Sequence, residues 1–361
     1  MKKEISELTV LYNDKTVGYL KQEDDTIAFQ YAESWVKDGF SISPLSLPLS
    51  DKVYISSSAH FEGTYGVFYD SLPDGWGALL TSRSLQKIGV NYERLPVLTK
   101  LSLISKQGKG ALEYRPSQMK EVHEIQYDLD EIAEQVRKIE ENEDGDLDQI
   151  YNHAGSSGGA RPKINYLYEG EEWIVKFPAV SDGKDAGYNE YLANQTAERS
   201  QINVNQYKLF PSERCKGYYG AKRFDRKKGR KVHMISLSAL LETDYRIPNL
   251  DYMHLFQVIR KIGCDAGDIS EGYRRMCFNV LYKNRDDHGK NFAFLYDEDR
   301  KGYVLSPFYD ITETANKYEQ EMTVLGNKNP TQEDLIRLAE RIKMKPEEYR
   351  KIIEQVASSM Q

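Results

Sequence analysis

The first third of the chain alternates short apolar segments with turn residues. The stretch LTVLYNDKTVGYL places Asn13 and Asp14 between two apolar runs, a pattern typical of a β-hairpin. A further strand is predicted at residues 27–31, after which prolines and glycines divide the chain into loops. Residues 1–115 are therefore predicted to form a β-rich subdomain.

The next segment changes to a helical period. Apolar residues within 128–140 recur at helical spacing among acidic ones, so an amphipathic helix is predicted there. The stretch EENEDGDLD (140–148) then carries six acids and a glycine, and we interpret it as a linker. Residues 116–150 are thus predicted to be a helix followed by an acidic linker.

The rest of the chain reads as strands first and helices later. Residues 151–228 predict a glycine-rich loop, a strand, a polar turn, a second strand and a helix at 185–201. Residues 229–361 are mainly helical in pattern, interrupted by a hairpin at 292–305, and a capping signal at Thr331 and Asp334 precedes the penultimate helix. Pro346 suits the first turn of the last helix. The fold class predicted is α+β, with a small β-lobe before a larger helical lobe.

Composition narrows the class of protein. The 361 residues are 40% hydrophobic and 11% aromatic, which favours a folded protein, and the net charge of −7 gives no general case for nucleic-acid binding. The three cysteines lack CxxC spacing and fit a reducing compartment. The stretch MKKEISELTVLYND lacks the apolar core of a signal peptide, and no run reaches the roughly 18 apolar residues needed to span a bilayer. A soluble cytoplasmic protein is expected.

The stretch NVLYKNRDDHGKNFAF carries the strongest chemical signal. Between two apolar runs, Asp286 and Asn291 have the spacing D-x-x-x-x-N, with Arg285 directly before the acid. In a protein-kinase catalytic loop the Asp accepts the proton of the substrate hydroxyl and the Asn binds magnesium. The spacing is common by chance, so a solvated turn between a helix and a strand also explains it.

Three further features occur in the order that a kinase requires. Asp310 follows the predicted hairpin, Lys176 lies inside an apolar strand, and the glycines of 155–159 precede that lysine. Each has a plainer explanation, since the lysine could extend from an edge strand and the glycines could form a flexible turn. Glu190, on the predicted helix, either pairs with Lys176 or lies on a solvated helix face. The combined order favours phosphoryl transfer.

Two other functions remain open. Asp286, Asp287 and His288 could form a metal-dependent phosphohydrolase site, although consecutive residues cannot easily face one ion. We expect His288 to brace the loop or contact nucleotide, and Asp287 to be structural or solvent-facing. A nucleotide-binding pseudokinase that sequesters a partner is the other alternative. Its mark would be loss of a reactive residue, but Asp286, Asn291, Asp310 and Lys176 are all present.

These motifs resemble a known family. GSSGGARPK, IVKFP, NEYLA, KRFDR, NRDDHGKN and LSPFYD, in that order, resemble the HipA-like serine/threonine kinases of bacterial toxin–antitoxin modules. VGYL, SLPLS, FYDSLPDGWG and GALEYRP resemble the β-rich subdomain that precedes that family's kinase core. The resemblance covers nearly the whole chain and implies a bilobal protein-kinase-like fold that binds ATP and Mg²⁺. It assigns 1–115 to the β-rich subdomain, 116–150 to the helix and linker, 151–228 to the small lobe and 229–361 to the helical lobe.

The resemblance also implies roles for individual residues. Asp286 would be catalytic, Asn291 and Asp310 would hold magnesium, and Glu190 would position Lys176. Ser156, or its neighbour Ser157, would be autophosphorylated. The residues implied in nucleotide binding are Gly155, Ser156, Ser157, Gly158, Gly159, Ala160, Lys163, Lys176, Lys222, Arg223, Phe224, His288 and Tyr309.

Partners follow from the same resemblance. The family phosphorylates cytoplasmic proteins, with an aminoacyl-tRNA synthetase as precedent, and pairs with a helix-turn-helix antitoxin. The acidity of this chain indicates that DNA is contacted only indirectly, through that antitoxin, and no membrane is expected. Two departures stand out: Lys222 occupies the hinge position where the family usually has Glu, and the segment after RFDR lacks an acidic continuation.

Overall fold

The computed structural model divides into two compact units. Unit 1 comprises Met1–Tyr188 and Tyr207–Ile235, and unit 2 comprises Asn189–Gln206 and Ser236–Gln361. The predicted N-terminal subdomain and linker belong to unit 1, as does the predicted small lobe apart from Asn189–Gln206, which belongs to unit 2. The residues that the structure describes are 4–24, 26–56, 59–104, 106, 108–118, 128–154, 158–314 and 317–360.

Unit 1 begins with a five-stranded antiparallel sheet in the order β4-β3-β2-β1-β5. Its strands are β1 (Glu7–Tyr12), β2 (Lys15–Glu23), β3 (Thr26–Tyr31), β4 (Val53–Ile55) and β5 (Leu112–Arg115). Asn13 and Asp14 join β1 to β2 with φ values of 45° and 64°, the left-handed pair that a tight hairpin turn needs. The predicted hairpin is confirmed.

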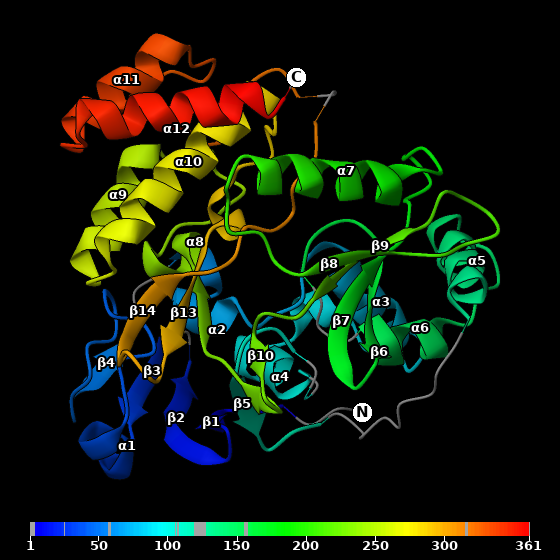
Figure 1. The fold of residues 1–361 in the computed structure, drawn as a ribbon. Coiled ribbons are helices and arrows are strands. Elements are labelled where there is room, and N and C mark those ends of the chain that lie inside the picture. The colour runs from blue at the N-terminus through cyan, green and yellow to red at the C-terminus, as the bar shows by residue number, and fades with distance from the viewer. Residues whose placement is uncertain are drawn as a thin grey trace. The chain divides into compact units, whose positions relative to one another are not determined.

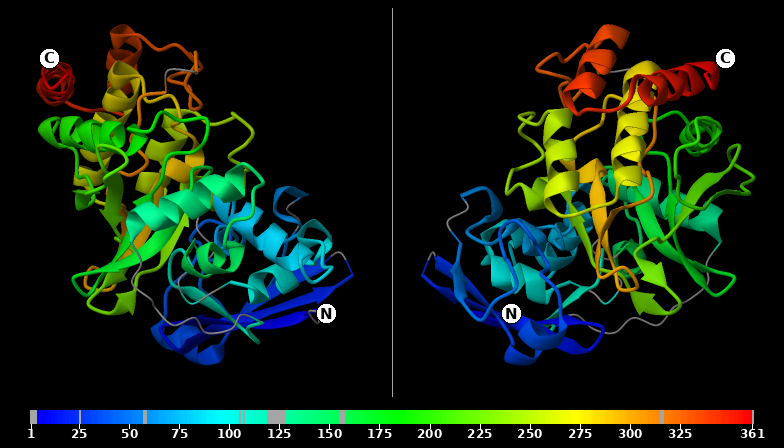
Figure 2. Two further views of the ribbon diagram at one scale, coloured as in Figure 1. Left: turned by 90° about the vertical axis from the view of Figure 1, so that its right-hand side faces the viewer. Right: turned by 60° about the vertical axis from the view of Figure 1, so that its left-hand side comes forward.

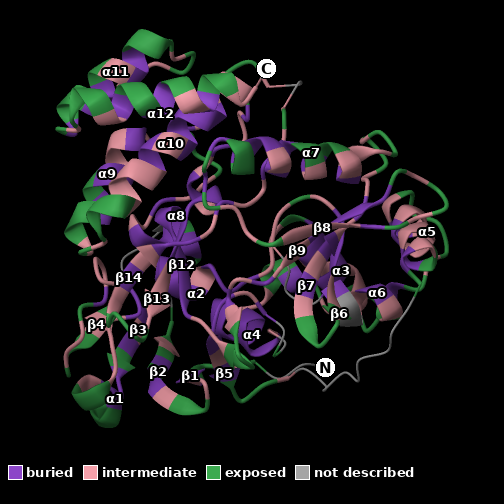
Figure 3. Cartoon of the chain, in the orientation of Figure 1, coloured by how far each residue is buried: buried purple, intermediate pink, exposed green. Residues whose placement is uncertain are grey.

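The segment between β3 and β5 contains helices that the glycine and proline pattern concealed. They are α1 (Glu33–Asp38), η1 (Ala59–Phe61), α2 (Gly66–Tyr69), α3 (Gly75–Gln86), η2 (Tyr92–Arg94) and α4 (Val97–Ser102). Every residue of α4 is buried, including its lysine (Figure 3). The N-terminal region is β-rich as predicted, but buried helices make up much of its core.

A second sheet in unit 1 is the scaffold of the predicted small lobe. It is antiparallel in the order β6-β7-β9-β8, with β6 (Lys163–Tyr168), β7 (Glu171–Lys176), β8 (Tyr207–Phe210) and β9 (Tyr218–Lys222). Helices α5 (Leu129–Glu140) and α6 (Leu147–Ala154) pack with this sheet in one core, as does α3 (Figure 1). One hydrophobic cluster joins these elements, with Trp76, Leu80, Ile132, Val136, Ile150, Ile164 and Val175 among its members.

The acidic stretch 140–148 differs from the linker we predicted. It spans the end of α5, the turn at residues 141–146 and the start of α6, and Ile139 and Leu147 on either side of that turn are buried in the same cluster. A tight turn whose acidic side chains face solvent has the same composition as a linker, which is why the sequence predicted a linker here. The helix predicted at 128–140 is confirmed as α5, capped by the Asp128 side chain.

Unit 1 ends in short strands. These are β10 (Arg226–Lys227), β11 (Arg230–Lys231) and β12 (Met234–Ser236), and the chain passes into unit 2 within β12.

Unit 2 is mainly helical, as predicted. Its elements are most of α7 (Ala186–Arg199), then α8 (Leu237–Leu240), α9 (Tyr252–Lys261), α10 (Ala266–Tyr282), η3 (Gly289–Asn291), β13 (Ala293–Asp297), β14 (Gly302–Leu305), α11 (Gln332–Arg341) and α12 (Pro346–Ser358). Figure 2 shows α10, α11 and α12 side by side. Thr331 and Asp334 form the predicted capping box, and Pro346 begins α12. Across the described ranges, no helix is long and apolar enough to cross a membrane.

Candidate active site

The loop that follows α10 carries most of the predicted reactive residues. Helix α10 is capped at its C-terminal end by Lys283, whose φ of 62° is the left-handed geometry that terminates helices. Residues 284–288 then lead into η3, and β13 begins directly afterwards. Gly289 packs closely against its surroundings, because a Cβ atom there would lie 2.6 Å from the Ser238 Oγ and 2.7 Å from the Leu250 Cδ1, and a larger residue would have to displace these two side chains. The loop is therefore short and fixed at both ends.

Asn291 fastens this loop to itself. Its Nδ2 donates to the main-chain oxygen of Asp286 at 2.6 Å, and its main-chain N–H donates to the oxygen of His288 at 2.9 Å. The hydrogen bond from Nδ2 assigns the orientation of the side-chain amide, so the Oδ1 of Asn291 is directed away from the Asp286 carbonyl. An amide oxygen held in this way is a suitable ligand for Mg²⁺.

The carboxylate of Asp286 has a cationic partner that the sequence did not suggest. The Lys317 Nζ donates to the Asp286 Oδ1, and it also donates to the Glu321 Oε1 at 2.8 Å. The Asp286 side chain remains 40% exposed, so it can still meet a substrate. Lys317 lies far along the chain in a segment without periodicity, and no local signal pointed to it.

His288 braces the loop, in agreement with one of its two predicted roles. Its Nδ1 accepts the main-chain N–H of Lys290 at 3.2 Å, and its ring lies 4.9 Å from that of Tyr245. Burial lowers the pKa of His288, while the Asp286 and Asp310 carboxylates act to raise it. The charges of both acids therefore act on the imidazole.

Asp287 is structural, and the alternative that it faces solvent is wrong. Its side chain is buried, accepting the Tyr252 hydroxyl at 2.7 Å and the main-chain N–H of Glu321 at 2.8 Å. Asn279 in turn donates to the Tyr252 hydroxyl at 2.9 Å. Burial raises the pKa of Asp287 to about 7 despite these donors. The carboxylate thus anchors residues 321–322 to the loop, and both of its oxygens are engaged by these donors.

Asp310 occupies a strained position after the hairpin of β13 and β14. Its φ is 54°, in the left-handed region that a non-glycine residue seldom adopts. The residues around it are fixed, because Phe308 and Ile311 are buried and the Tyr309 hydroxyl donates to the main-chain oxygen of Lys290. The last contact joins the Asp310 segment to the Asp286 loop.

The donor set fits magnesium better than a transition metal. The described part of the chain has no group of three or more His, Cys, Asp or Glu side chains that could hold a metal ion. Mg²⁺ commonly takes one or two protein oxygens and completes its shell with water and phosphate. The Asn291 amide oxygen and the Asp310 carboxylate match that modest requirement.

In unit 1, two lysines face each other across neighbouring strands. Lys176 at the end of β7 is the register partner of Lys163 at the start of β6, and the Lys176 Nζ lies 5.6 Å from the centre of the Tyr219 ring. The Lys163 Nζ donates to the main-chain oxygen of Gly158. Like charges directly opposite each other are destabilising, and an anion beside them would relieve the repulsion. This pair is suited to phosphate.

The described part of the glycine-rich loop lies beside Lys163. Gly155, Ser156 and Ser157 lie outside the described residues. Gly159 donates its main-chain N–H to the Asp74 carboxylate, and Ala160 is exposed. Asp74 was not among the predicted site residues, although it belongs to the motif FYDSLPDGWG.

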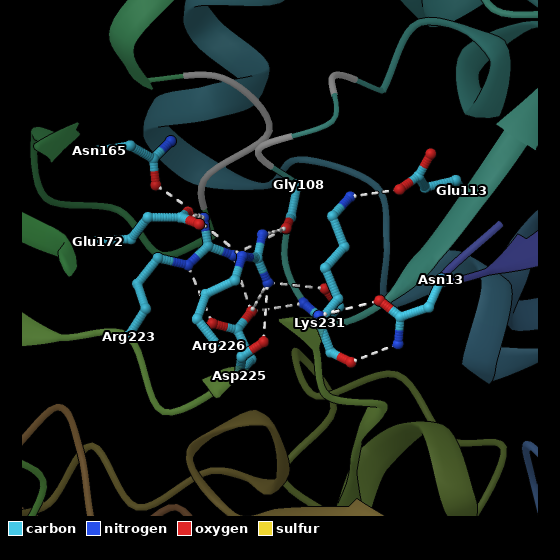
Figure 4. Close-up of polar contacts among 10 residues, drawn as sticks. Asn13, Gly108, Glu113, Asn165, Glu172, Arg223, Asp225, Arg226 and Lys231 are labelled. Carbon is cyan, nitrogen blue, oxygen red and sulfur yellow. Dashed lines mark hydrogen bonds and ion pairs between the residues drawn. The ribbon is translucent and has the colours of Figure 1, made fainter. Parts of the chain in front are cut away.

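The predicted hinge at residues 222–224 is tied into a buried ion network (Figure 4). The Arg223 guanidinium donates to Asp225 at 2.7 Å and to the main-chain oxygen of Gly108 at 2.8 Å, and its main-chain N–H donates to Glu172. Burial alone would raise the pKa of Asp225, but the guanidiniums of Arg223 and Arg226 hold it well below its ordinary value. The Arg223 side chain therefore serves the fold.

Two expectations about this region stay predictions. The Lys222 Nζ pairs with Glu171 at 2.9 Å, and the Arg223 main-chain N–H is bound to the main-chain oxygen of Glu172. The predicted contact between the main chain of 222–224 and adenine is untested. Glu190 is buried on α7 and belongs to unit 2, whereas Lys176 belongs to unit 1. The predicted pair of Glu190 with Lys176 is therefore untested.

Comparison with known proteins finds two matching families. The HipA-like C-terminal domain family matches residues 155–361, and the HipA N-terminal domain family matches residues 8–115. Two relatives from Sinorhizobium fredii (strain NBRC 101917 / NGR234) are named "Putative kinase Y4dM" and "Putative kinase Y4mE". The first is 28% identical over 171 residues, 44% of this chain and 41% of that protein. The second is 34% identical over 61 residues, 17% of this chain and 14% of that protein. The chain therefore aligns with less than half the length of either relative.

A solved structure extends the likeness to the whole fold. HipA of Shewanella oneidensis MR-1, determined with HipB and its operator DNA, matches with a TM-score of 0.75 and 19% identity over 97% of this chain and 88% of that one. At this identity the match establishes the fold alone. With both domain families matched in order along the sequence, the chain belongs to the HipA-like family.

Proposed function

We propose that this protein is an ATP- and Mg²⁺-dependent serine/threonine kinase. The observation that carries the proposal is the Asp286 loop, in which the Asn291 amide holds the main chain of Asp286 at 2.6 Å and the Asp310 segment is tied to Lys290. Phosphoryl transfer depends mainly on positioning and charge, so a short loop braced at each reactive residue is the scaffold it requires. Two relatives that are named putative kinases support the same class of reaction.

Each residue has a distinct part in the proposed reaction. Asp286 orients the substrate hydroxyl and accepts its proton as the oxygen attacks the γ-phosphorus and the bond to ADP breaks. Asn291 and Asp310 hold Mg²⁺, which when bound supplies neutralising charge to the phosphate oxygens. Lys176 binds the phosphates, and His288 holds the loop by accepting the Lys290 N–H, a role of the neutral ring that burial favours by lowering its pKa.

Substrate and regulation follow from the family. We infer a cytoplasmic protein substrate, with an aminoacyl-tRNA synthetase as the precedent, and autophosphorylation on Ser156 or Ser157. A phosphate there would compete with ATP for the N–H groups of the same loop, and so would switch the kinase off. The Shewanella relative was determined with HipB and operator DNA, and we propose a helix-turn-helix antitoxin for this chain too, with DNA reached through that partner.

The contacts of Asp287 weigh against the phosphohydrolase alternative. That reaction would need Asp286, Asp287 and His288 around one metal, yet the Asp287 oxygens accept the Tyr252 hydroxyl and the Glu321 N–H instead. A pseudokinase is disfavoured because Asp286, Asn291, Asp310 and Lys176 are all retained.

The fate of the γ-phosphate tests the proposal. The purified chain and its Asp286→Ala variant are incubated with Mg-ATP labelled in the γ-phosphate, and label in protein is compared with label released as inorganic phosphate. We expect labelled protein from the wild type and a loss of roughly a hundredfold or more in the variant. Release of phosphate without labelled protein would favour hydrolysis, and ATP binding with neither product would favour the pseudokinase.

A further inference from the structure

Helix α3 begins with an acid that bonds to a distant segment instead of its own helix. Asp74 is the N-cap residue of α3, a position where Asp normally accepts a main-chain N–H from the first turn, yet its side chain makes no such bond within this described helix. It accepts the main-chain N–H of Gly159 instead. The acid therefore joins the N-terminal subdomain to the end of the predicted glycine-rich loop.

The contact is reciprocal. The main-chain N–H of Trp76, in the first turn of α3, donates to the Gly159 oxygen at 3.0 Å. The first N–H groups of a helix have no partner within the helix, so the Gly159 carbonyl satisfies one of them. Both polar main-chain groups of Gly159 are thus bound by the start of α3.

Glycines make this approach possible. A Cβ atom at Gly75, whose φ is +45°, would lie 2.5 Å from the Gly159 oxygen and 2.6 Å from its carbonyl carbon. Such distances are far below van der Waals contact, so any other residue would force the two segments apart. In the sequence PDGWG, the first glycine is therefore needed for steric reasons, and the aspartate before it provides the hydrogen bond to Gly159.

A second contact holds the same stretch from the sheet. The buried Lys163 donates from its Nζ to the Gly158 oxygen. The start of α3 is itself held against the sheet, because Trp76 is buried in the same hydrophobic cluster as Ile164 and Val175. Gly158 and Gly159 are fixed between α3 and β6.

We propose that Asp74 is a positioning residue that fixes the Gly158–Gly159 end of the loop in the geometry that binds the phosphates of ATP. The inference rests on the proposed function, since it takes this loop to be the phosphate site. Gly158 and Gly159 are already held in place before a phosphate binds, so less conformational entropy is lost on binding and affinity rises accordingly. Because the Gly159 N–H is bound to Asp74, Asp74 acts by positioning this stretch beside Lys163, and the Gly159 N–H is not itself a phosphate ligand.

Binding measurements isolate this role. Calorimetry compares Mg-ATP with adenosine, which lacks phosphates and so cannot use the loop. We expect Asp74→Ala to weaken Mg-ATP about tenfold while changing adenosine less than about twofold. Asp74→Asn keeps an acceptor oxygen and should restore most of the Mg-ATP affinity. In steady-state assays the Asp74→Ala effect should appear in KM for ATP more than in kcat.

A matched variant separates positioning from general damage. Asp128 caps α5 in the same unit, accepting the Asp130 N–H at 2.8 Å, and Asp128→Ala should lower thermal stability while leaving Mg-ATP binding unchanged. Unchanged or tighter Mg-ATP binding in Asp74→Ala, or an equal loss for adenosine, would overturn the proposal. A wild type that binds Mg-ATP but transfers no phosphate would refute the kinase and leave the role of Asp74 to be decided by binding alone.

Discussion

The buried Asp287 should make the stability of unit 2 depend on pH. Its carboxyl ordinarily titrates near 3.8, and burial raises the folded-state pKa to about 7. Below 3.8 the carboxyl is protonated in both the folded and unfolded states. As the pH rises toward 7, the unfolded chain ionises while the folded protein must hold the proton or bury a charge. The stability that Asp287 contributes at low pH is therefore lost as the pH rises through about 7.

The size of this effect follows from the gap between the two pKa values. Each unit of pH between them is worth about 1.4 kcal/mol, so raising the pH from about 5 to about 8 should remove about 2.5 kcal/mol. The Asp287→Asn variant keeps the shape of the side chain and cannot ionise. The difference in free energy of unfolding between wild type and Asp287→Asn should therefore shift by about that amount over this range.

Urea unfolding followed by circular dichroism is a suitable assay, because helices dominate unit 2. The three tryptophans, Trp35, Trp76 and Trp173, all lie in unit 1, so their fluorescence reports on the other unit. Asp334→Asn is the matched control: Asp334 is also buried in unit 2, but main-chain hydrogen bonding at Thr331 lowers its pKa. Its variant should differ from wild type by a constant amount between about pH 5 and about pH 8. A constant difference for Asp287→Asn as well would refute the reasoning.

Two further predictions concern the ion pairs. Asp225→Ala leaves the Arg223 and Arg226 guanidiniums buried without their shared carboxylate, and should cost about 3–5 kcal/mol in the free energy of unfolding of unit 1, measured by tryptophan fluorescence; a loss below about 1 kcal/mol would contradict the network. Lys317→Ala removes a contact of the Asp286 carboxylate, and should lower kcat for phosphoryl transfer about tenfold with little change in KM for ATP. An unchanged kcat would show that Lys317 does not position Asp286.

Local patterns were sufficient where the cause of a structure is local. The turn at Asn13 and Asp14 and the Thr331 capping box depend on residues a few positions apart, and both are found as predicted. The spacing of Asp286 and Asn291 was equally informative, because the amide that closes the loop lies within it.

Long-range contacts explain what could not be predicted. Asp287 looked like another loop acid because Tyr252, which buries it, lies on a different helix. Lys317 and Asp74 contact segments that are distant in the sequence, and no local motif around either residue predicts these contacts. The acids of 140–148 were interpreted as a linker because composition does not reveal that the flanking helices share a core.

The central claim is that Asp286 serves transfer of phosphate to a protein hydroxyl. The most direct measurement is site-resolved mass spectrometry of the wild type and Asp286→Ala after incubation with Mg-ATP, with ATP binding by the variant verified first. The account predicts phosphate on Ser156 or Ser157 in the wild type and none on either residue in the variant. Equal phosphorylation of both proteins, or of neither, would contradict it.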